Sequence, residues 1–482
     1  MNDEQENTTS FNERFNRHFN DFDKALKSAA EKFLSLPDSR VRVVSHLDAD
    51  GISSAAIIIK ALNRLGRFYS LTILPQLKYE DVVRFSSEKD KVFIFTDLGS
   101  GELCAFNELM KDKQVFILDH HQPEACELKE NITHVNPHNF DFNGSSEICG
   151  AGVTYMFAKH LDSKNKDLSR IAILGIIGDV QNPKEGLNKL ILKDAVDTGN
   201  IKVIKGLRIF GAQTKPLYKA LVQSTDFNIP GVTGNESGAI QFLKQIGVEP
   251  KINGKWRRII DLDKDELKRL VEGIVMLRFG EDTPEDIIGD VYLFTKEREG
   301  SPLKDAKEFA TVLNACGRMG KASYGIGACL GDLRFKKLAV SVLDDYRKEI
   351  VNGLKFFEKN RNSNYVIEEN GLLIINAQSK IKPTVIGTVC SIIARNTSLK
   401  DDTFIMGLAR IDDRYTKISM RYKGNKEVNL KEILSDILGD SEGEVGGHHF
   451  AAGAYIASEY EQEFINRAKQ VIQDKLLKVK TL

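Results

Sequence analysis

The chain has 482 residues, of which 41% are hydrophobic and 28% charged, a composition typical of a globular protein. This length is too great for one ordinary hydrophobic core, so we expect two or three domains. Lysine plus arginine and aspartate plus glutamate number 68 each, which excludes a whole-molecule attraction to polyanions and leaves nucleic-acid contacts to local patches. The polar amino terminus and the lack of a long apolar run in the sequence predict a cytoplasmic protein with no membrane segment.

Residues 1–10 are polar and predict a disordered tail, and residues 11–36 have the apolar spacing of a helix that closes at Pro37. From residue 38 onward, short β-branched or aromatic runs alternate with helical segments. The runs VRVVS, LTIL, VFIFT and VFIL are separated in this way between residues 41 and 118. This alternation predicts an α/β fold with a doubly wound, mostly parallel sheet.

The remaining sequence changes pattern several times. A mainly helical stretch contains a capping box, Asp263 with Glu266, and we interpret it as an insertion. A long amphipathic helix is expected after it, followed by a compact α/β domain. The predicted segments are a tail and first helix (1–37), a catalytic sheet domain (38–183), an inserted domain (184–286), the remainder of the catalytic unit (287–335), a linker helix (336–362) and a smaller carboxy-terminal domain (363–482).

Six cysteines are scattered along the sequence, and no two of them form the C-x-x-C pair of a zinc ribbon or a redox site. Such spacing predicts a set of reduced thiols, as is usual in the cytoplasm. The six are Cys104, Cys126, Cys149, Cys316, Cys329 and Cys390.

Acidic residues and histidines follow three predicted strands. An aspartate at a strand end is more often a helix cap or a turn residue than a ligand. Here, however, the carboxyl ends of parallel strands should bring many of them into one crevice, where their repulsion requires a cation. Carboxylate and imidazole groups without thiolate favour Mn²⁺ or Mg²⁺, and a pair of such ions can clamp both oxygens of a phosphoryl displacement. The residues concerned are His46, Asp48 and Asp50, then Asp97, then Asp119, His120 and His121.

Four short motifs carry a resemblance to a known family. The sequences HLDADG (46–51), FTDLG (95–99), LDHH (118–121) and IGD (177–179) resemble, in order and context, the motifs of the DHH phosphoesterases. The resemblance implies two metal ions per active site, one held by His46, Asp48 and Asp97 and the other by Asp50, Asp97, His120 and Asp179. It also implies that Asp97 bridges the ions, that Asp119 orients a histidine and that His121 faces the scissile phosphate.

Further motifs imply a substrate site. The sequence GGHHFAAG (446–453) resembles the GGH-x-x-AAG motif of the DHH-associated domain, and SMR (419–421) resembles an S-x-R motif of exonucleases. NACGR (314–318) resembles a nuclease segment whose arginine reaches a backbone phosphate, a role that suits the planar guanidinium. Residues 380–431, with eleven Lys or Arg against five Asp or Glu, could track a nucleic acid or could be a solvated face. The implied substrate-binding residues are Arg318, Ser419, Arg421, Gly446, Gly447 and His448.

Together these motifs resemble RecJ-type single-strand exonucleases. The segments GLRIFGAQTKPLYKAL, STDFNIPGVTGNESGAIQFLKQIG and DLDKDELKRLV resemble the domain inserted into archaeal RecJ-like, GINS-associated nucleases. This implies that residues 184–286 dock a GINS subunit, although the insertion could instead be a lid over the active site. IPGVTGNESGAIQFL also looks like a helix-hairpin-helix backbone binder.

The activity implied is hydrolysis of single-stranded DNA or RNA from one end to mononucleotides, with the 5′-to-3′ direction on DNA favoured. A phosphodiesterase of short oligonucleotides or cyclic dinucleotides is an alternative of the same class. A replication scaffold with little catalysis is an alternative of another class. The complete set of candidate ligands argues against the scaffold, because unneutralised carboxylates are costly to keep together.

Overall fold

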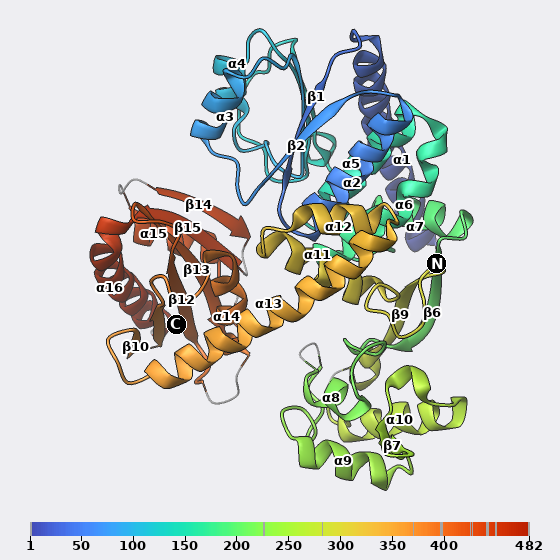
Figure 1. The fold of residues 1–482 in the computed structure, drawn as a ribbon, viewed down its shortest axis with the longest axis vertical. Coiled ribbons are helices and arrows are strands. Elements are labelled where there is room, and N and C mark those ends of the chain that lie inside the picture. The colour runs from blue at the N-terminus through green and yellow to red at the C-terminus, as the bar shows by residue number, and fades with distance from the viewer. Residues whose placement is uncertain are drawn as a thin grey trace. The chain divides into compact units, whose positions relative to one another are not determined.

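The computed structural model describes residues 2–480, except positions 225–226, 282, 370, 396–398, 425, 427, 440–442 and 449–450; within that part, side chains are described at positions 16–439, 445–447 and 451–475. The chain divides into two compact units, Met1–Leu343 and Asp344–Leu482. Figure 1 shows the helices and strands of both units. Within the described residues, no helix combines the length and the apolar character needed to cross a membrane.

The first unit is built on a five-stranded sheet with the order β2-β1-β3-β4-β5, in which all neighbours are parallel. β2 lies on one side of β1, and β3, β4 and β5 lie on the other, so the chain builds the sheet outward from β1 in both directions. This confirms the predicted doubly wound, parallel sheet. The strands are β1 (Val41–His46), β2 (Tyr69–Leu74), β3 (Val92–Thr96), β4 (Gln114–Leu118) and β5 (Ile132–Val135).

Helices cover both faces of this sheet because alternate strand residues point to opposite sides. On one face, Phe93 and Phe95 pack with Phe85 of α3 and Phe106 of α4. On the other face, Phe116 packs against α1 and α5. The helices are α1 (Asn2–Ser35), α2 (Ala49–Arg64), α3 (Tyr79–Ser86), α4 (Leu103–Leu109), α5 (Gly150–Leu161), α6 (Ser169–Gly178) and α7 (Asn188–Asp197).

The expected disordered tail is instead the beginning of α1, which starts at Asn2. The polar residues before position 11 include no proline or glycine to interrupt a helix. Acidic residues near the start also interact favourably with the helix dipole. Polarity alone was therefore a poor signal for the helix boundary.

Between α7 and α11 the chain forms an antiparallel strand pair, β6 (Ile201–Leu207) with β9 (Ile288–Phe294), and a small domain beyond it. That domain has its own core, which includes Leu221, Leu243 and Leu270. The predicted capping box is present, because Asp263 accepts from the Glu266 amide at 2.8 Å and Glu266 accepts from the Asp263 amide at 3.0 Å. The elements are α8 (Leu217–Val222), α9 (Glu236–Gln245), β7 (Lys251–Ile252), β8 (Lys255–Trp256) and α10 (Lys264–Leu277).

Three helices follow, and the last of them, α13, runs from the first unit into the second. They are α11 (Ala306–Arg318), α12 (Ala322–Cys329) and α13 (Leu333–Asn360). Short 3-10 helices lie at Pro137–Phe140, Ser163–Leu168, Ile259–Asp261, Pro284–Ile287 and Ser458–Tyr460.

The second unit contains a six-stranded sheet with the order β10-β11-β12-β13-β15-β14, antiparallel except between β11 and β12. One face of the sheet packs against α15 and α16 through a core that includes Ile418, Leu434 and Ala468. The strands are β10 (Val366–Glu369), β11 (Leu372–Asn376), β12 (Thr403–Arg410), β13 (Tyr415–Lys423), β14 (Gly443–His448) and β15 (Ala451–Ala457). The helices are α14 (Pro383–Ala394), α15 (Leu430–Leu438) and α16 (Glu461–Lys480).

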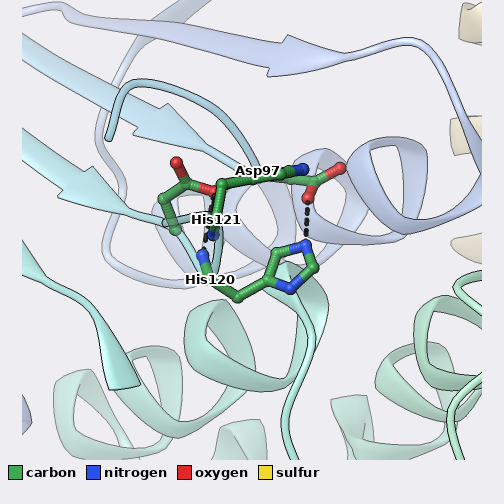
Figure 2. Close-up of side chains that lie close together, drawn as sticks. Asp97, His120 and His121 are labelled. Carbon is green, nitrogen blue, oxygen red and sulfur yellow. Dashed lines mark hydrogen bonds and ion pairs between the residues drawn. The ribbon is translucent and has the colours of Figure 1, made fainter. Parts of the chain in front are cut away.

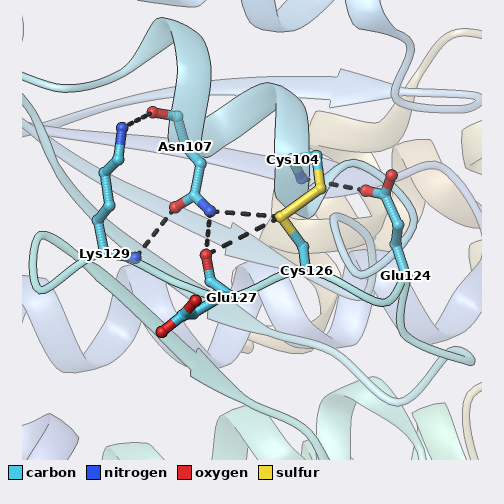
Figure 3. Close-up of a disulfide and its surroundings, with 6 residues drawn as sticks. All are labelled: Cys104, Asn107, Glu124, Cys126, Glu127 and Lys129. Carbon is cyan, nitrogen blue, oxygen red and sulfur yellow. Dashed lines mark hydrogen bonds between the residues drawn. A yellow bond between two sulfur atoms is a disulfide. The ribbon is translucent and has the colours of Figure 1, made fainter.

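The expectation that all six cysteines are reduced is wrong for one pair. Cys104, in α4, and Cys126, in the loop between β4 and β5, form a disulfide (Figure 3). Their Cα atoms lie 5.7 Å apart although 22 residues separate them in sequence, so the pairing depends on the fold and not on a short motif. The other four cysteines are free and buried.

Candidate metal centre

The first part of the site is the turn between β1 and α2. Asp48 is the N-cap of α2, and its Oδ1 accepts the Gly51 amide at 3.0 Å. Its other carboxylate oxygen lies 3.1 Å from Nδ1 of His46, the last residue of β1. A side chain at position 51 would meet the His46 carbonyl oxygen at 2.3 Å, so this close turn requires glycine. Asp48 therefore caps a helix and faces the site at the same time.

Asp97 directly follows β3 and lies at the centre of the site. Its φ of 58° places it in the left-handed region, which is unusual for a residue other than glycine. The carboxylate is buried, with His46 Nδ1 3.5 Å from Oδ2 and His120 Nε2 3.2 Å from Oδ1. Figure 2 shows the His120 imidazole directed toward this carboxylate. The left-handed backbone thus holds Asp97 between the imidazoles of His46, at the end of β1, and His120, after β4.

The segment after β4 supplies Asp119 and both neighbouring histidines. Asp119 is buried and accepts the Ser100 amide at 2.9 Å, and its Oδ1 lies 2.8 Å from Nδ1 of His121. Nδ1 of His120 lies 2.7 Å from the Gly144 carbonyl oxygen, to which it can only donate. This contact leaves Nε2 of His120 as the acceptor atom that faces Asp97.

Asp50 and Asp179 come from two different helix ends. The carboxylate of Asp50 accepts the backbone amides of Gly150 and Ala151, at 2.7 and 2.9 Å, where α5 begins. Asp179 ends α6, and its Oδ2 lies 3.9 Å from Nδ1 of His120. Glycine is needed at position 175 of α6, since a Cβ there would lie 2.3 Å from the Asp50 carboxylate.

Gln181 belongs to this site and was not predicted from the sequence. Its Nε2 donates at 2.8 Å both to Asp179 and to the carbonyl oxygen of Gly144, and its Oε1 accepts from Asn188 at 3.0 Å. The same Gly144 oxygen accepts from His120. A single glutamine after the IGD motif carries no chemical signal in the sequence, so only the structure identifies it.

The cluster perturbs the pKa values of its members. Burial raises the pKa of Asp50 well above its ordinary value, and repulsion from Asp97 adds to the shift. Burial also raises the pKa of Asp179 to about 6, opposed by attraction to His120 and reinforced by repulsion from Asp97. Burial disfavours a charged His46, but the carboxylates of Asp48 and Asp97 outweigh burial and raise its pKa. In the absence of cations, protons must neutralise these charges.

The residues fit a divalent metal ion. The two carboxylate oxygens of Asp97 and Nδ1 of His46 are buried and have no hydrogen-bond partner, which is costly unless another group satisfies them. Oxygen and imidazole atoms without thiolate suit Mn²⁺ or Mg²⁺. Within the part of the chain that is described, three groups have ligand atoms within 4.8 Å of one another: Asp97, Asp119, His120 and His121; His46, Asp48 and Asp97; and Asp50, His120 and Asp179.

Helix α11, which ends at Arg318, contacts the first turn of the site. Asn314 Oδ1 accepts the Ala49 amide at 3.0 Å. A Cβ at Gly317 would lie 1.6 Å from the carbonyl oxygen of Leu47, so glycine is required for the close approach. The nuclease-like segment at 314–318 is therefore packed against the turn that carries Asp48.

The remaining predicted site residues lie in the second unit. Ser419 in β13 and Gly446 in β14 both pair with Gly453 of β15, so they flank the same position of the central strand. Arg421 donates from Nε to Ser391 Oγ at 2.8 Å and from Nη1 to the Met420 carbonyl oxygen at 2.6 Å. Gly447 has φ 115°, and a Cβ there would meet the Ala451 carbonyl oxygen at 2.3 Å. The His448 side chain and residues His449 and Phe450 lie outside the described part of the chain.

Three family models match the chain. They are the DHH family, N-terminal domain (residues 40–178), the DHH-CID domain (209–291) and the DHHA1 domain (370–474). Uncharacterized protein MJ0831 of Methanocaldococcus jannaschii is 32% identical over 468 residues, which cover 95% of this chain and 98% of that protein.

Two solved structures share the fold at low sequence identity. RecJ of Thermus thermophilus in complex with Mn²⁺ has a TM-score of 0.57 and 18% identity, covering 93% of this chain and 55% of that one. The same protein is also solved with Mg²⁺. The chain thus spans about half the length of that RecJ. CDC45 of Entamoeba histolytica has a TM-score of 0.60 and 12% identity, covering 95% of this chain and 98% of that one.

The parallel sheet, the clustered carboxylates and imidazoles at its carboxyl edge, and the matched domains support the class of metal-dependent phosphoesterases. Within that class, the chain belongs to the DHH family and is RecJ-like, as its motifs predicted.

Proposed function

We propose that this protein is a two-metal-ion exonuclease that hydrolyses single-stranded DNA or RNA from one end to mononucleotides. The observation that carries the proposal is the position of Asp97, whose two buried oxygens have no hydrogen-bond partner and face imidazoles from two different ligand groups. A carboxylate in that position can bridge two ions. The 5′-to-3′ direction on DNA remains the favoured prediction from the motifs.

The residues take the following roles in the proposed reaction. His46, Asp48 and Asp97 would hold one ion, and Asp50, Asp97, His120 and Asp179 would hold the other. When bound, such ions activate water and neutralise charge on the phosphate. Asp119 orients His121, since their atoms lie 2.8 Å apart, and His121 faces the scissile phosphate. Arg318 binds a backbone phosphate, and the predicted substrate-binding residues of the second unit, Ser419, Arg421, Gly446, Gly447 and His448, bind another part of the strand.

A replication scaffold is the second candidate, favoured by the structural likeness to CDC45. Catalysis and scaffolding are compatible in one chain, and we propose that the small domain between β6 and β9 docks a GINS subunit. A phosphodiesterase for short oligonucleotides or cyclic dinucleotides is the remaining alternative, and the dependence of the rate on strand length separates it from an exonuclease.

Asp97→Asn tests the metal centre. Asparagine tolerates the left-handed backbone at position 97, so the fold should persist while the bridging charge is lost. We expect cleavage of end-labelled single strands to fall at least about 100-fold, and Mn²⁺ binding by calorimetry to weaken. Asp38→Asn, at a carboxylate whose side chain is 77% exposed, is the control and should match the wild type. Full activity of Asp97→Asn, or of the wild type in excess EDTA, would contradict the two-metal proposal.

Arg421→Ala tests the proposed strand contact in the second unit. The guanidinium is held by Ser391 and by its own strand, so it presents a fixed positive charge. Loss of one phosphate contact should reduce the slope of log K against log salt by about 0.7 and weaken strand binding. An unchanged salt dependence, measured by fluorescence anisotropy in EDTA, would show that Arg421 does not contact the backbone of the strand.

A further inference from the structure

A pocket of about 390 Å³ lies in the first unit beside the candidate metal centre. Its lining includes Ile177 and positions 180–183, together with residues of and next to β6 and β9, namely Lys205 and positions 207–210 and 289–292. The start of α11 contributes Asp305 and Lys307. The volume falls in the range of small-molecule sites in proteins.

One residue of the pocket wall also belongs to the hydrogen-bond network of the metal centre. Gln181 lines the pocket, and its Nε2 donates to Asp179 at 2.8 Å. Val180 also lines it, and this valine is 92% exposed and has a φ of 60°. A β-branched residue in the left-handed region is strained, and an exposed valine gains little from packing. Backbone strain of this kind, next to the candidate metal-binding residue Asp179, points to contact with a bound molecule.

The charges of the pocket favour an anion. Its basic residues are Lys205, Arg208 and Lys307, and its acidic residues are Asp290 and Asp305. Asp290 is paired with Lys205 at 3.0 Å and also with Lys184. Asp305 is used as the N-cap of α11, where it accepts the amide of Lys307 at 2.8 Å. The lining thus carries three cations against two carboxylates, and Lys184, which lies outside the lining, adds a second lysine to the Asp290 carboxylate.

Two aromatic side chains, Phe210 and Tyr292, stand in the same lining. Arg208 lies over Gly289, because a Cβ at position 289 would come within 2.4 Å of Arg208 Cδ. Cations beside aromatic rings are the combination by which proteins hold single-stranded nucleic acid, with phosphates on the cations and bases on the rings. The absence of a side chain at position 289 leaves room for the Arg208 side chain, whose guanidinium lies 5.5 Å from the centroid of the Phe227 ring and whose Nη1 donates to the Asp286 carbonyl oxygen at 3.4 Å.

We propose that this pocket binds one nucleotide of the single strand whose neighbouring phosphodiester lies at the metal centre. The inference rests on the proposed nuclease function and adds a substrate contact from the β6–β9 pair. That pair then has a role of its own, separate from the docking role proposed for the small domain beyond it.

Strand binding without cleavage tests this proposal. The affinity of a labelled oligothymidylate is measured by anisotropy in EDTA at several salt concentrations. Arg208→Gln removes the charge, whereas Gly289→Val keeps the charge but displaces Arg208 and fills the pocket. Both variants should bind about tenfold more weakly, and Arg208→Gln should lower the salt slope by about 0.7. Lys268→Gln, at a lysine with a 72% exposed side chain on α10, is the control and should bind like the wild type.

The outcomes separate this proposal from the nuclease proposal. Wild-type affinity in both pocket variants, with folding verified by Trp256 fluorescence, overturns the pocket assignment even if the wild type cleaves strands. Binding of thymidine monophosphate is measured in the same variants. If the variants lose this binding but bind the strand like the wild type, the pocket takes free nucleotide and the proposal is overturned. Weakened strand binding supports the pocket even if the wild type proves unable to cleave, in which case only the nuclease proposal fails.

Discussion

Gln181 connects two residues of the candidate metal centre, Asp179 and His120, through hydrogen bonds. Its amide nitrogen donates to Asp179 and to Gly144, whose carbonyl oxygen also accepts from His120. Asp179 and His120 therefore share one hydrogen-bond network, which fixes the orientation of both side chains. Groups that orient metal ligands typically change metal affinity or activity by about 10- to 100-fold when they are removed.

Gln181→Leu should therefore weaken Mn²⁺ binding and single-strand cleavage by about 10- to 100-fold, while most of the fold is retained. Gln181→Glu keeps the shape but replaces the donor with a carboxylate beside Asp179, so it should be at least as damaging. Calorimetric titration with Mn²⁺ measures the effect apart from turnover. Gln223→Leu, in the small domain, is the matched control. Equal metal affinity in Gln181→Leu and wild type would show that the network does not position the ligands.

At the scale of residues, candidate metal ligands were easiest to identify where several carboxylates and imidazoles follow successive strands. His46, Asp97 and His120 come together because successive parallel strands end at one edge of the sheet, and that convergence follows from the strand pattern. Gln181 could not be found in this way, because its role depends on a carbonyl oxygen 37 residues away. The Cys104–Cys126 disulfide was missed for a similar reason, since a contact between a helix and a loop has no local signal.

At the scale of elements, local caps predicted helices better than polarity did. The Asp263–Glu266 capping box marks the start of α10 as expected. Glu266 has a second partner in the structure, Arg257, whose Nη1 donates to Oε1 at 2.6 Å. Arg257 is buried and was not linked to the cap by sequence, because it precedes the helix in an irregular segment. The ion pair thus ties the start of α10 to the β7–β8 hairpin.

The Arg257–Glu266 pair predicts how the small domain responds to acid. The hydrogen bond from Arg257 is the main cause that lowers the pKa of Glu266 from 4.5 to about 2. A lowered carboxyl pKa stabilises the fold above pH 4.5, and this stabilisation is lost as the pH falls from 4.5 toward 2. We expect on the order of 1 to 2 kcal/mol, less than the full shift implies, because Glu266 retains contact with water.

Trp256 is the only tryptophan of the chain and packs against Tyr218, with 4.3 Å between ring centroids, so its fluorescence reports unfolding of this domain. Urea midpoints should fall between about pH 4.5 and 2.5 in the wild type and fall less in Glu266→Gln, which should already be less stable at about pH 7. Glu272→Gln, with a 61% exposed side chain on the same helix, should keep the wild-type profile. Parallel profiles for Glu266→Gln and wild type would mean that the pair does not set the acid response.

For the whole molecule, the fold class and the family could be predicted from the sequence. The alternation of strands and helices predicted the parallel sheet, and the motifs predicted the RecJ-like family. The contacts that attach the small domain to α11 could not be predicted from the sequence. Glu308 of α11 is buried and accepts the Gln213 amide at 3.0 Å and the Thr214 hydroxyl at 2.6 Å, so α11 connects this domain to the turn near Asp48. A buried glutamate within a helix gives no sign of a partner that lies about a hundred positions earlier in the chain.

The last prediction separates docking from catalysis. Arg208 and Ile287 are joined by a backbone hydrogen bond of 2.8 Å at the open end of the β6–β9 pair, so a short Asn-Gly turn can replace the residues between them. Because this deletion removes the partners of Glu308, it is combined with Glu308→Gln to avoid a buried charge. If the small domain is a docking module, the shortened protein should lose binding to a GINS complex and still cleave single strands, with at most about a tenfold loss from the missing Phe210. The full-length Glu308→Gln protein is the control and should do both. Retained GINS binding would refute the docking role, whereas a folded, shortened protein that cannot cleave would indicate that the domain acts as a lid on the active site.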